Sequence, residues 1–328
     1  MFRLKSSIEM LALFMFVKLT ADKAGLGAQA FPITALVSTS ILAFAFASTA
    51  LAPPAMAAQA EDVLNAPDAH VVPVGLYKLN VLQSGDALES DHDDLNSRKH
   101  WRLIWNCEFD SPSDLKKWNV VNHWDNANNE LQAYRSKACT VRDGCLFIEA
   151  RKEDTADGDK SRHYTSGKLD TNKRFDLKYG RFDCRFKVPS GKGYWPAFWM
   201  LPSSGKWPPE IDWMEILGHR PQIIEVTNHY GTHVNGFHPW HGPKRYELHP
   251  DFSEEFHTLT GVWDEREIVC YVDGKRISVS QDGVPHEKMY MILNLAVGGD
   301  LPGAPDVTTP FPANFVVDYV RVFKRLRR

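Results

Sequence analysis

The chain has 328 residues, of which 43% are hydrophobic and 12% aromatic, so a packed core is easily supplied. Its formal net charge of -3 at pH 7 argues against nucleic acid as the main partner, because a phosphate-binding surface usually carries a basic excess. The length allows one large domain or two small ones.

Residues 1–58 have the pattern of a targeting segment. No charged residue occurs between Ala24 and Ala60, and this window holds an apolar stretch, 33–52, followed by an Ala-x-Ala exit at 55–57. A basic start, an apolar stretch and a small-residue exit predict a secretory signal peptide. The alternative is an uncleaved membrane anchor, since a stretch of about 20 residues can span a bilayer. Either way, we expect the rest of the chain to be secreted, periplasmic or part of the cell envelope.

Residues 59–100 have the composition of an acidic linker or N-terminal extension. They contain eight acids against three bases and show no sustained periodicity. Such composition is usually solvated or disordered. Only the stretch 69–82 within it has the apolar character of a strand or two lying on the main domain.

Beyond this extension, short alternating runs are separated by Gly, Pro, Asn and Asp. Hairpin signals such as Asp143-Gly144 and Asp273-Gly274 punctuate the runs, and no helical segment exceeds one or two turns. This texture predicts an all-β antiparallel sandwich or barrel, and the length of the region suits a two-sheet sandwich formed by one domain over residues 101–328. The expected strands are 144–152, 179–189, 196–202, 210–217, 223–231, 256–264, 267–277, 289–299 and 314–324.

The chain has an odd number of cysteines, so at least one thiol is free or pairs outside the chain. No two of them form a Cys-x-x-Cys pair, which leaves a zinc knuckle or a redox motif without support. Cysteines are compatible with an oxidising compartment, but two of these fall on apolar alternation positions, Cys184 and Cys270, and are interpreted as small core residues. The full set is Cys107, Cys139, Cys145, Cys184 and Cys270.

The stretch 181–188 alternates charged with apolar residues. A period of two sends the apolar set into the core and the charged set, which includes Asp183 and Arg185, to the opposite face. That face is either an ordinary solvated surface or the polar floor of a cleft. The second interpretation is favoured if neighbouring strands point carboxylates and aromatic rings the same way.

Three carboxylates, Glu210, Asp212 and Glu215, stand among apolar residues on one predicted strand. Alternation places the first two on one face, whereas the third would point into the core. Burying a carboxylate without a partner is costly. We therefore predict a β-bulge at Trp213–Met214, which adds one residue and returns the third acid to the face of the other two, while Trp213 stays in the core.

Three acids on one face suggest either a metal site or paired acid and base chemistry. Calcium and magnesium suit carboxylates, but their sites usually come from loops rather than from a rigid strand. Two carboxyls about 5–5.5 Å apart suit a retaining glycoside hydrolase, in which one attacks the anomeric carbon and the other acts first as acid and then as base. Close like charges push the two pKa values apart, as those roles require.

The pattern Glu-x-Asp-x-x-Glu resembles that of glycoside hydrolase family 16, in the bulged form of its laminarinase-like endo-β-1,3-glucanase branch; the lichenase branch lacks the extra residue. The resemblance covers essentially residues 101–324 and implies a β-jelly roll with an open substrate cleft on its concave face. The further matching stretches are "NNELQAY" (128–134), "YTSGKLDT" (164–171), "YGRFDCRFKVPSGKGYWPAFWMLP" (179–202), "HYG" (229–231), "FHTLTGVW" (256–263), "YVDG" (271–274), "ILNLAVGG" (292–299) and "VDYVRV" (317–322).

The resemblance implies a role for each matching position. Glu210 would be the nucleophile, Glu215 the acid/base, and Asp212 a helper that hydrogen-bonds the nucleophile. His229 would approach the acid/base side from the neighbouring strand. Aromatic faces would pack on sugar rings, although each Trp has core packing as its alternative. The remaining expected substrate-binding residues are Asn129, Asp183, Arg185, Trp195, Trp199 and Trp207.

The resemblance also raises the question of bound metals. Family members often hold a structural calcium ion on the convex face, and Glu108, Gly144 and Asp318 match the positions that bind it; no cofactor is implied for catalysis. Four histidines in the stretch 229–241 can suggest zinc. The acids on the next strand and the Gly/Pro/Asn-rich loop favour a cleft lip instead.

The leading prediction is a monomeric retaining endo-hydrolase of β-linked polysaccharide, acting on β-1,3-glucan or a β-glucan-containing exopolysaccharide. A transglycosylase differs only in whether water or a sugar hydroxyl attacks the intermediate. A non-catalytic glucan-binding protein is the other class, and the presence of all three acids argues against it. Galactan-cleaving relatives also carry the bulged motif, and the "SSGKW" approach (203–207) differs from the usual Gly-rich run, so the polysaccharide stays open.

Overall fold

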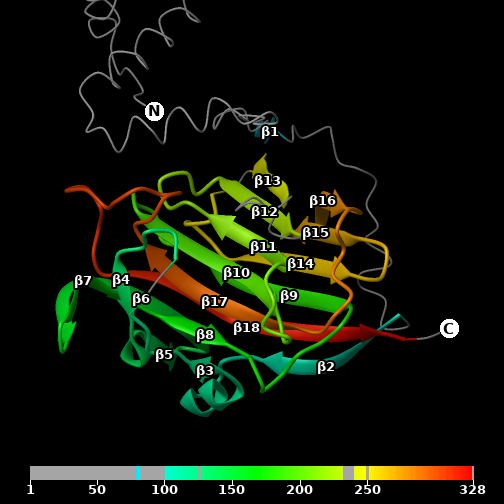
Figure 1. The fold of residues 1–328 in the computed structure, drawn as a ribbon, viewed down its shortest axis with the longest axis horizontal. Coiled ribbons are helices and arrows are strands. Elements are labelled where there is room, and N and C mark those ends of the chain that lie inside the picture. The colour runs from blue at the N-terminus through cyan, green and yellow to red at the C-terminus, as the bar shows by residue number, and fades with distance from the viewer. Residues whose placement is uncertain (1–78, 82–99, 125–126, 232–239, 249–250, 327–328) are drawn as a thin grey trace, which may run out of the picture. The chain divides into compact units, whose positions relative to one another are not determined.

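The protein is described by a computed structural model in which nearly all regular structure is β-strand (Figure 1). No helix in the part of the chain that the structure describes is long and apolar enough to span a membrane. The predicted signal or anchor, 1–58, lies outside that part. The described residues are 79–81, 100–124, 127–231, 240–248 and 251–326.

One sheet has eight strands and carries the three acids on β11. All its described pairings are antiparallel except that of β1 with β13. In spatial order its strands are β1 (Leu79–Val81), β13 (Trp240–Glu247), β12 (Ile223–His229), β11 (Glu210–Ile216), β10 (Tyr194–Pro202), β17 (Met289–Val297), β8 (Lys168–Asp170) and β3 (Asn119–Val120).

The other sheet has ten strands and includes the charged, alternating strand β9. In spatial order eight of them are β16 (Lys275–Ser280), β15 (Ile268–Val272), β14 (His257–Trp263), β9 (Gly180–Lys187), β18 (Ala313–Arg325), β6 (Cys145–Asp157), β7 (Lys160–Ser166) and β4 (Gln132–Tyr134). The others are β2 (Trp101–Cys107), which pairs with β18, and β5 (Cys139–Arg142), which pairs with β6; two 3-10 turns, η1 (Pro112–Lys117) and η2 (Ser136–Ala138), complete the regular structure.

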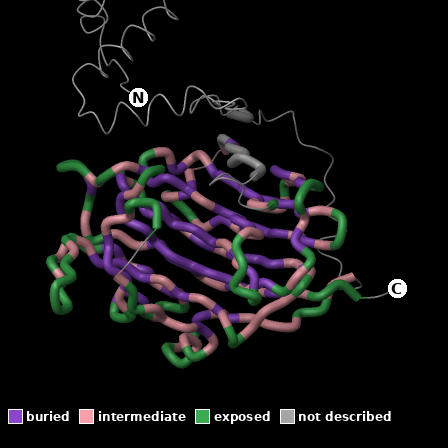
Figure 2. Tube along the Cα trace, in the orientation of Figure 1, coloured by how far each residue is buried: buried purple, intermediate pink, exposed green. Residues whose placement is uncertain are grey.

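The core lies between the two sheets and is filled by alternate residues of both. Figure 2 shows buried positions running along the strands and exposed ones gathered in the connections. From the ten-stranded sheet, Phe182 packs on Trp213 of the other sheet, with ring centroids 5.8 Å apart. Gly261 on β14 also faces this indole, and a Cβ at that position would lie 2.5 Å from the ring. The contact brings β14 close against the back of the strand that carries the acids.

The structure confirms the predicted all-β, two-sheet architecture. Each of the nine expected stretches contains a strand, and 267–277 contains two, because Asp273 and Gly274 make a turn between β15 and β16. The extension also contributes β1, within the stretch 69–82. Seven strands without clear alternation were missed. They are β2, β3, β4, β5, β7, β8 and β13.

The cysteines behave as core residues rather than as cross-links. All five are free thiols. Cys184 is 0% exposed and Cys270 is 1% exposed, which confirms the interpretation of both as small core residues.

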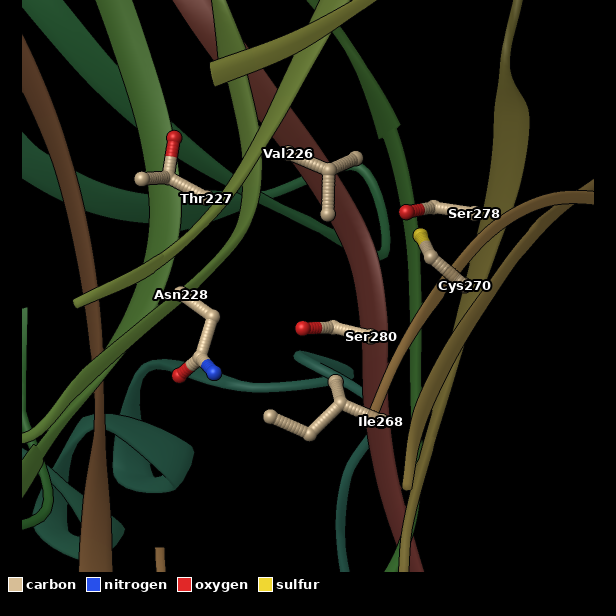
Figure 3. Close-up of a pocket in the computed structure, with 7 residues that line it drawn as sticks. All are labelled: Val226, Thr227, Asn228, Ile268, Cys270, Ser278 and Ser280. Carbon is tan, nitrogen blue, oxygen red and sulfur yellow. The ribbon is translucent and has the colours of Figure 1, made fainter. Parts of the chain in front are cut away.

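A small cavity lies between β12 and the β15–β16 hairpin (Figure 3). Its volume is about 10 Å³, enough for roughly one water molecule. Asn228 and Ser280 point into it from opposite sides. The cavity is therefore too small for a sugar ring. Its lining residues are Val226, Thr227, Asn228, Ile268, Cys270, Ser278 and Ser280.

Candidate active site

The predicted β-bulge is present in β11. Asp212 lies opposite Thr227 of β12, and Glu215 lies opposite Glu225, so two residues of β11 face a single residue of the partner strand. Those two residues, Trp213 and Met214, are both 0% exposed and belong to the core. The bulge therefore sends two consecutive side chains inward and returns the third acid to the outer face.

The outer face of the eight-stranded sheet carries the three acids in a row. Directly opposed residues of an antiparallel pair project to the same side, so each acid has a neighbour from β12 on that face. The nearest strand on the other side, β10, adds indole rings at alternate positions. The three cross-strand pairs are Glu210–His229, Asp212–Thr227 and Glu215–Glu225.

Glu215 is held so that it keeps a proton at neutral pH. The indole Nε1 of Trp195 donates to its Oε1 at 2.9 Å, and the Thr227 hydroxyl lies 3.5 Å from its Oε2. Burial, followed by the negative charges of Glu225 and Glu210, raises the pKa of Glu215 to about 8. A carboxyl that is still protonated at pH 7 can serve as a general acid.

Glu210 and Asp212 share a hydrogen bond, which requires a proton on one of the two carboxyls. Burial and then the charge of Asp212 raise the pKa of Glu210 well above its usual value. Burial and then the charge of Glu215 raise the pKa of Asp212, while the hydrogen bond with Glu210 lowers it. The indole Nε1 of Trp207 donates to Glu210 Oε2 at 2.6 Å and favours its charged form. Glu210 thus has an indole donor that favours its charged form and a hydrogen-bonded neighbour, Asp212, that opposes it.

His229 stands beside this pair rather than beside the acid/base. Its Nε2 lies 3.0 Å from Asp212 Oδ2, and its ring centroid is 6.0 Å from that of Trp207. The expectation that His229 approaches the acid/base side is therefore wrong, because the β11–β12 register places it opposite Glu210. Burial lowers the pKa of His229, so its imidazole is neutral at pH 7.

A polar network that the sequence did not reveal continues the floor beyond Trp199. The indole Nε1 of Trp199 donates to Asn294 Oδ1 at 2.7 Å, and Asn294 Nδ2 donates to the Tyr134 hydroxyl at 3.1 Å. That hydroxyl donates to Glu130 Oε2 at 3.2 Å. Lys168 Nζ lies 5.1 Å from the centroid of the Trp199 ring. These residues occur in stretches that match the family, 128–134, 164–171 and 292–299, and this match was the only sign in the sequence that they belong to the site.

Among the other predicted residues, Trp207 is 40% exposed and Trp195 is 9% exposed. Asn129 donates to Asp300 Oδ1 at 2.8 Å, in a loop next to Gly299, where a Cβ would lie 3.6 Å from Trp195. The structure thus gathers the three tryptophans around the acids and places Asn129 near the Trp195 end of the row.

Asp183 and Arg185 lie elsewhere. They stand on β9 of the ten-stranded sheet, on the side opposite the core residues of that strand, so the core separates them from the acids. Asp183 pairs with Arg181 at 2.7 Å and accepts from the Thr260 hydroxyl at 2.9 Å, while Arg185 pairs with Asp318. The substrate-binding prediction for both is wrong: alternation assigned their face correctly, but it could not assign the sheet.

The donor set expected for calcium fits that ion poorly. Glu108 holds the Arg321 guanidinium through two contacts of 2.7 and 3.0 Å, and Asp318 is paired with Arg185. The Arg321 hydrogen bond comes first among the causes that lower the pKa of Glu108. Gly144 lies in the β5–β6 turn with φ 71°. Two guanidinium groups cancel the charge of the two carboxylates, whereas calcium sites depend on carboxylate charge.

A second grouping of potential metal ligands lies in the row itself. One ligand atom from each of Glu210, Asp212 and His229 lies within 4.8 Å of the others. The proton shared by the two carboxyls would have to leave before a cation could bind. As for the zinc alternative, His233 and His238 fall outside the described residues.

This arrangement defines a class of protein. A carboxyl that keeps its proton at neutral pH shares an open sheet face with a hydrogen-bonded carboxyl pair, and indole rings flank them. A carboxylate-dependent glycoside hydrolase needs paired carboxyls with separate roles and aromatic surfaces on which sugar rings can pack.

Comparison with known proteins gives the family. The chain belongs to glycosyl hydrolases family 16, whose family model matches residues 122–315. It is 35% identical over 278 residues to a beta-glucanase of Rhodothermus marinus, covering 76% of this chain and 93% of that protein. It is 36% identical over 260 residues to glucan endo-1,3-beta-glucosidase A1 of Niallia circulans, covering 68% of this chain but 38% of that longer protein.

A solved structure shows the same fold. The laminarinase catalytic domain of Thermotoga maritima superposes with a TM-score of 0.64 at 38% identity, covering 69% of this chain and 99% of that domain. The chain is therefore a glycoside hydrolase built on the two-sheet sandwich of this family.

Proposed function

We propose that this chain is a retaining endo-hydrolase of β-1,3-linked glucan, with Glu210 as nucleophile, Glu215 as acid/base and Asp212 as the partner of the nucleophile. The observation that carries the proposal is the alignment of the acids on one sheet face: the pKa of Glu215 is raised to about 8, and Glu210 has the Trp207 indole as donor and Asp212 as a hydrogen-bonded carboxyl neighbour. Several relatives with known names are laminarinases or endo-1,3-beta-glucanases, which supports the substrate class.

In the first step, Glu215 gives its proton to the glycosidic oxygen as that bond breaks, and the leaving sugar departs as an alcohol. Glu210 attacks the anomeric carbon once the proton that it shares with Asp212 lies on Asp212. The product is a glycosyl ester on Glu210. The Trp207 N–H, 2.6 Å from Glu210 Oε2, supports the carboxylate before the attack.

In the second step, Glu215 is ionised and takes a proton from a water molecule as that water attacks the anomeric carbon. The ester bond to Glu210 breaks, the sugar is released with its original configuration, and Glu215 regains its proton. If a sugar hydroxyl replaces water, the same residues perform transglycosylation, so the acceptor alone separates the two reactions.

The linkage is the open part of the proposal, because similar proteins act on several polymers. Relatives include endo-1,3-1,4-beta-glycanase EglC of Rhizobium meliloti, 35% identical over 208 residues, and a keratan-sulfate endo-1,4-beta-galactosidase of Sphingobacterium multivorum, 30% identical over 246 residues. A beta-1,3-glucan-binding protein of Penaeus monodon is 30% identical over 179 residues. The acid row in this chain supports catalysis over binding alone.

A substrate panel tests the proposal. Laminarin, lichenan, agarose, carrageenan and xyloglucan are incubated with wild type, Glu210→Gln and Glu215→Gln, with the exposed Glu255→Gln as the control for loss of one charge. We expect release of reducing ends from laminarin, near-complete loss in the first variant, and a loss of about 10²–10⁴-fold in the second. Proton NMR of the fresh products should show the β-anomer first.

Two results would contradict parts of the proposal. Equal release of reducing ends by wild type and Glu210→Gln would overturn the nucleophile assignment, and an α-anomer formed first would overturn retention. Binding of laminarin without turnover of any substrate in the panel would favour a recognition protein.

We also propose that the chain acts outside the cytoplasm, as a secreted, periplasmic or envelope protein, and works as a monomer. The support is the uncharged window 24–60 with its apolar stretch. N-terminal sequencing of the protein recovered from its native host separates a cleaved signal from an anchor. Calcium has no part in the proposal, since arginine side chains already pair with Glu108 and Asp318.

A further inference from the structure

A fourth carboxylate, Glu225, stands in the acid row and has no role in the chemistry described so far. It lies on β12 directly opposite Glu215, immediately past the bulge, and is 1% exposed. A regular β11 would put a different residue opposite Glu225, so the bulge that aligns Glu215 with the other acids also aligns it with this one. A buried carboxylate placed across from another is unfavourable for stability and calls for a function.

Glu225 has a cationic partner in the turn between the two strands. Its Oε1 lies 3.6 Å from Nη2 of Arg220. Arg220 belongs to the short turn between β11 and β12, where its backbone N–H donates to Leu217 O at 2.7 Å and its carbonyl accepts from Ile223 at 2.9 Å. The pair therefore combines a guanidinium that is 37% exposed with a carboxylate that is 1% exposed. A charge fixed in this way can act on Glu215 with little screening by water.

The other described groups around this carboxyl pair come from three strands, β10, β11 and β12. From β10, the Trp195 N–H donates to Glu215; on β11 itself, Glu210 and Asp212 interact electrostatically with it. On β12, the Thr227 hydroxyl lies 3.5 Å from Glu215 Oε2. The strand register also places Arg245 of β13 opposite Glu225.

The turn between β11 and β12 holds one further titratable side chain, His219. Burial and then the nearby Arg220 lower its pKa, so it carries no charge at neutral pH. Among the charges that raise the pKa of Glu215, Glu225 comes before Glu210.

We propose that Glu225, fixed by Arg220, is a positioning residue for the acid/base: its carboxylate across the strand pair keeps the proton on Glu215 before the first step and draws a proton back to it in the second. This inference rests on the roles proposed above for Glu210 and Glu215. Glu225 does not contact the reacting atoms; it acts through Glu215.

The constancy of this charge distinguishes Glu225 from the nucleophile. Glu210 loses its negative charge when it forms the ester, so its effect on Glu215 disappears in the second step. Glu225 forms no bond during the reaction, so no step of the chemistry consumes its carboxylate. It therefore makes Glu215 a stronger base at the stage when water must be deprotonated.

The test is the pH dependence of laminarin hydrolysis by Glu225→Gln, Arg220→Gln and the control Glu255→Gln. The basic limb of kcat/KM reports the proton on Glu215 in the free enzyme. We expect this limb to move down by about one pH unit in Glu225→Gln and to move up in Arg220→Gln, because the two variants remove opposite charges. The control should keep the limb of the wild type.

A readout besides activity is the carbon-13 NMR titration of the Glu215 side-chain carboxyl, identified by its absence in Glu215→Gln. Its midpoint should shift in the same two directions. Active variants with an unmoved limb and midpoint would overturn the role of Glu225, as would shifts in the same direction for both. If Glu225→Gln does not fold, Arg220→Gln decides alone, since it leaves Glu225 in place. Absence of hydrolysis by the wild type would instead overturn the proposed function.

Discussion

The acids of β11 show how a single residue can be favourable for chemistry and unfavourable for folding. All three have raised pKa values because burial and like charges oppose ionisation. Their alignment was predictable from the sequence, since a buried unpaired Glu215 was improbable on energetic grounds. Glu225 was not predictable in the same way, because its meaning depends on the cross-strand register.

Glu215→Gln should stabilise the protein, and the gain should grow with pH. In the folded chain the pKa of Glu215 is about 8, above the ordinary value of 4.5. The folded state therefore binds the proton more tightly than the unfolded state, and stability is lost as pH rises from about 4.5 towards 8. Glutamine removes this loss, so we expect the Tm of the variant to exceed that of wild type by a few °C at pH 8 and by little at pH 5.

Differential scanning calorimetry at the two pH values measures this difference, and Glu255→Gln controls for the change in net charge. A Tm gain of the same size at both pH values would mean that the effect comes from packing rather than from the proton.

At the scale of elements, alternation identified the strands that have one face in the core, such as β9 and β11, together with the side chains on each face. It failed for short strands such as β3, β4 and β8, which contain two or three residues each. Such strands form because neighbouring strands offer backbone hydrogen bonds. Two or three residues are too few to show an alternation of apolar and polar side chains. It also failed to separate the two sheets, which is why Asp183 was placed with the acids.

The bulge in β11 packs against the opposite layer at Gly261, and Gly261→Ala tests whether the bulge depends on this contact. A Cβ at position 261 would lie 2.5 Å from the Trp213 ring. The ring fills the core behind the acids, so the added methyl group must push it and with it the bulged segment. We expect the free energy of unfolding to fall by about 1–3 kcal/mol and kcat on laminarin to fall as well, because the acids lose their alignment.

Urea denaturation and steady-state kinetics measure the two effects, and Trp213→Phe supplies the control. The smaller ring leaves room for the methyl group, so the double variant should lose less stability than the sum of the single losses. Additive losses would show that Gly261 and the bulge are independent.

At the scale of the whole molecule, the sequence supplied the architecture because both sheets obey the same rule of one face in and one face out. The order of the motifs supplied the family. The site required the three-dimensional register: which strands are neighbours decides that His229 serves the nucleophile side and that Glu225 faces the acid/base. Neither relation follows from a pattern within a single strand.

The reactivity of the cysteine thiols measures how tightly the two sheets are packed together. All five cysteines are free, and four of them are buried, whereas Cys145 at the start of β6 is partly exposed. In the native protein we expect a thiol reagent such as DTNB to modify Cys145 alone, and in urea to modify all five, because the others lie inside the closed core. Burial also raises the pKa of Cys139 to about 12, which keeps that thiol unreactive at neutral pH.

The variant Cys145→Ser should give no fast reaction with the reagent, and dithiothreitol should leave the Tm of the wild type unchanged. More than one fast thiol, or a Tm lowered by reduction, would mean that in solution the two sheets open or that a disulfide crosses them.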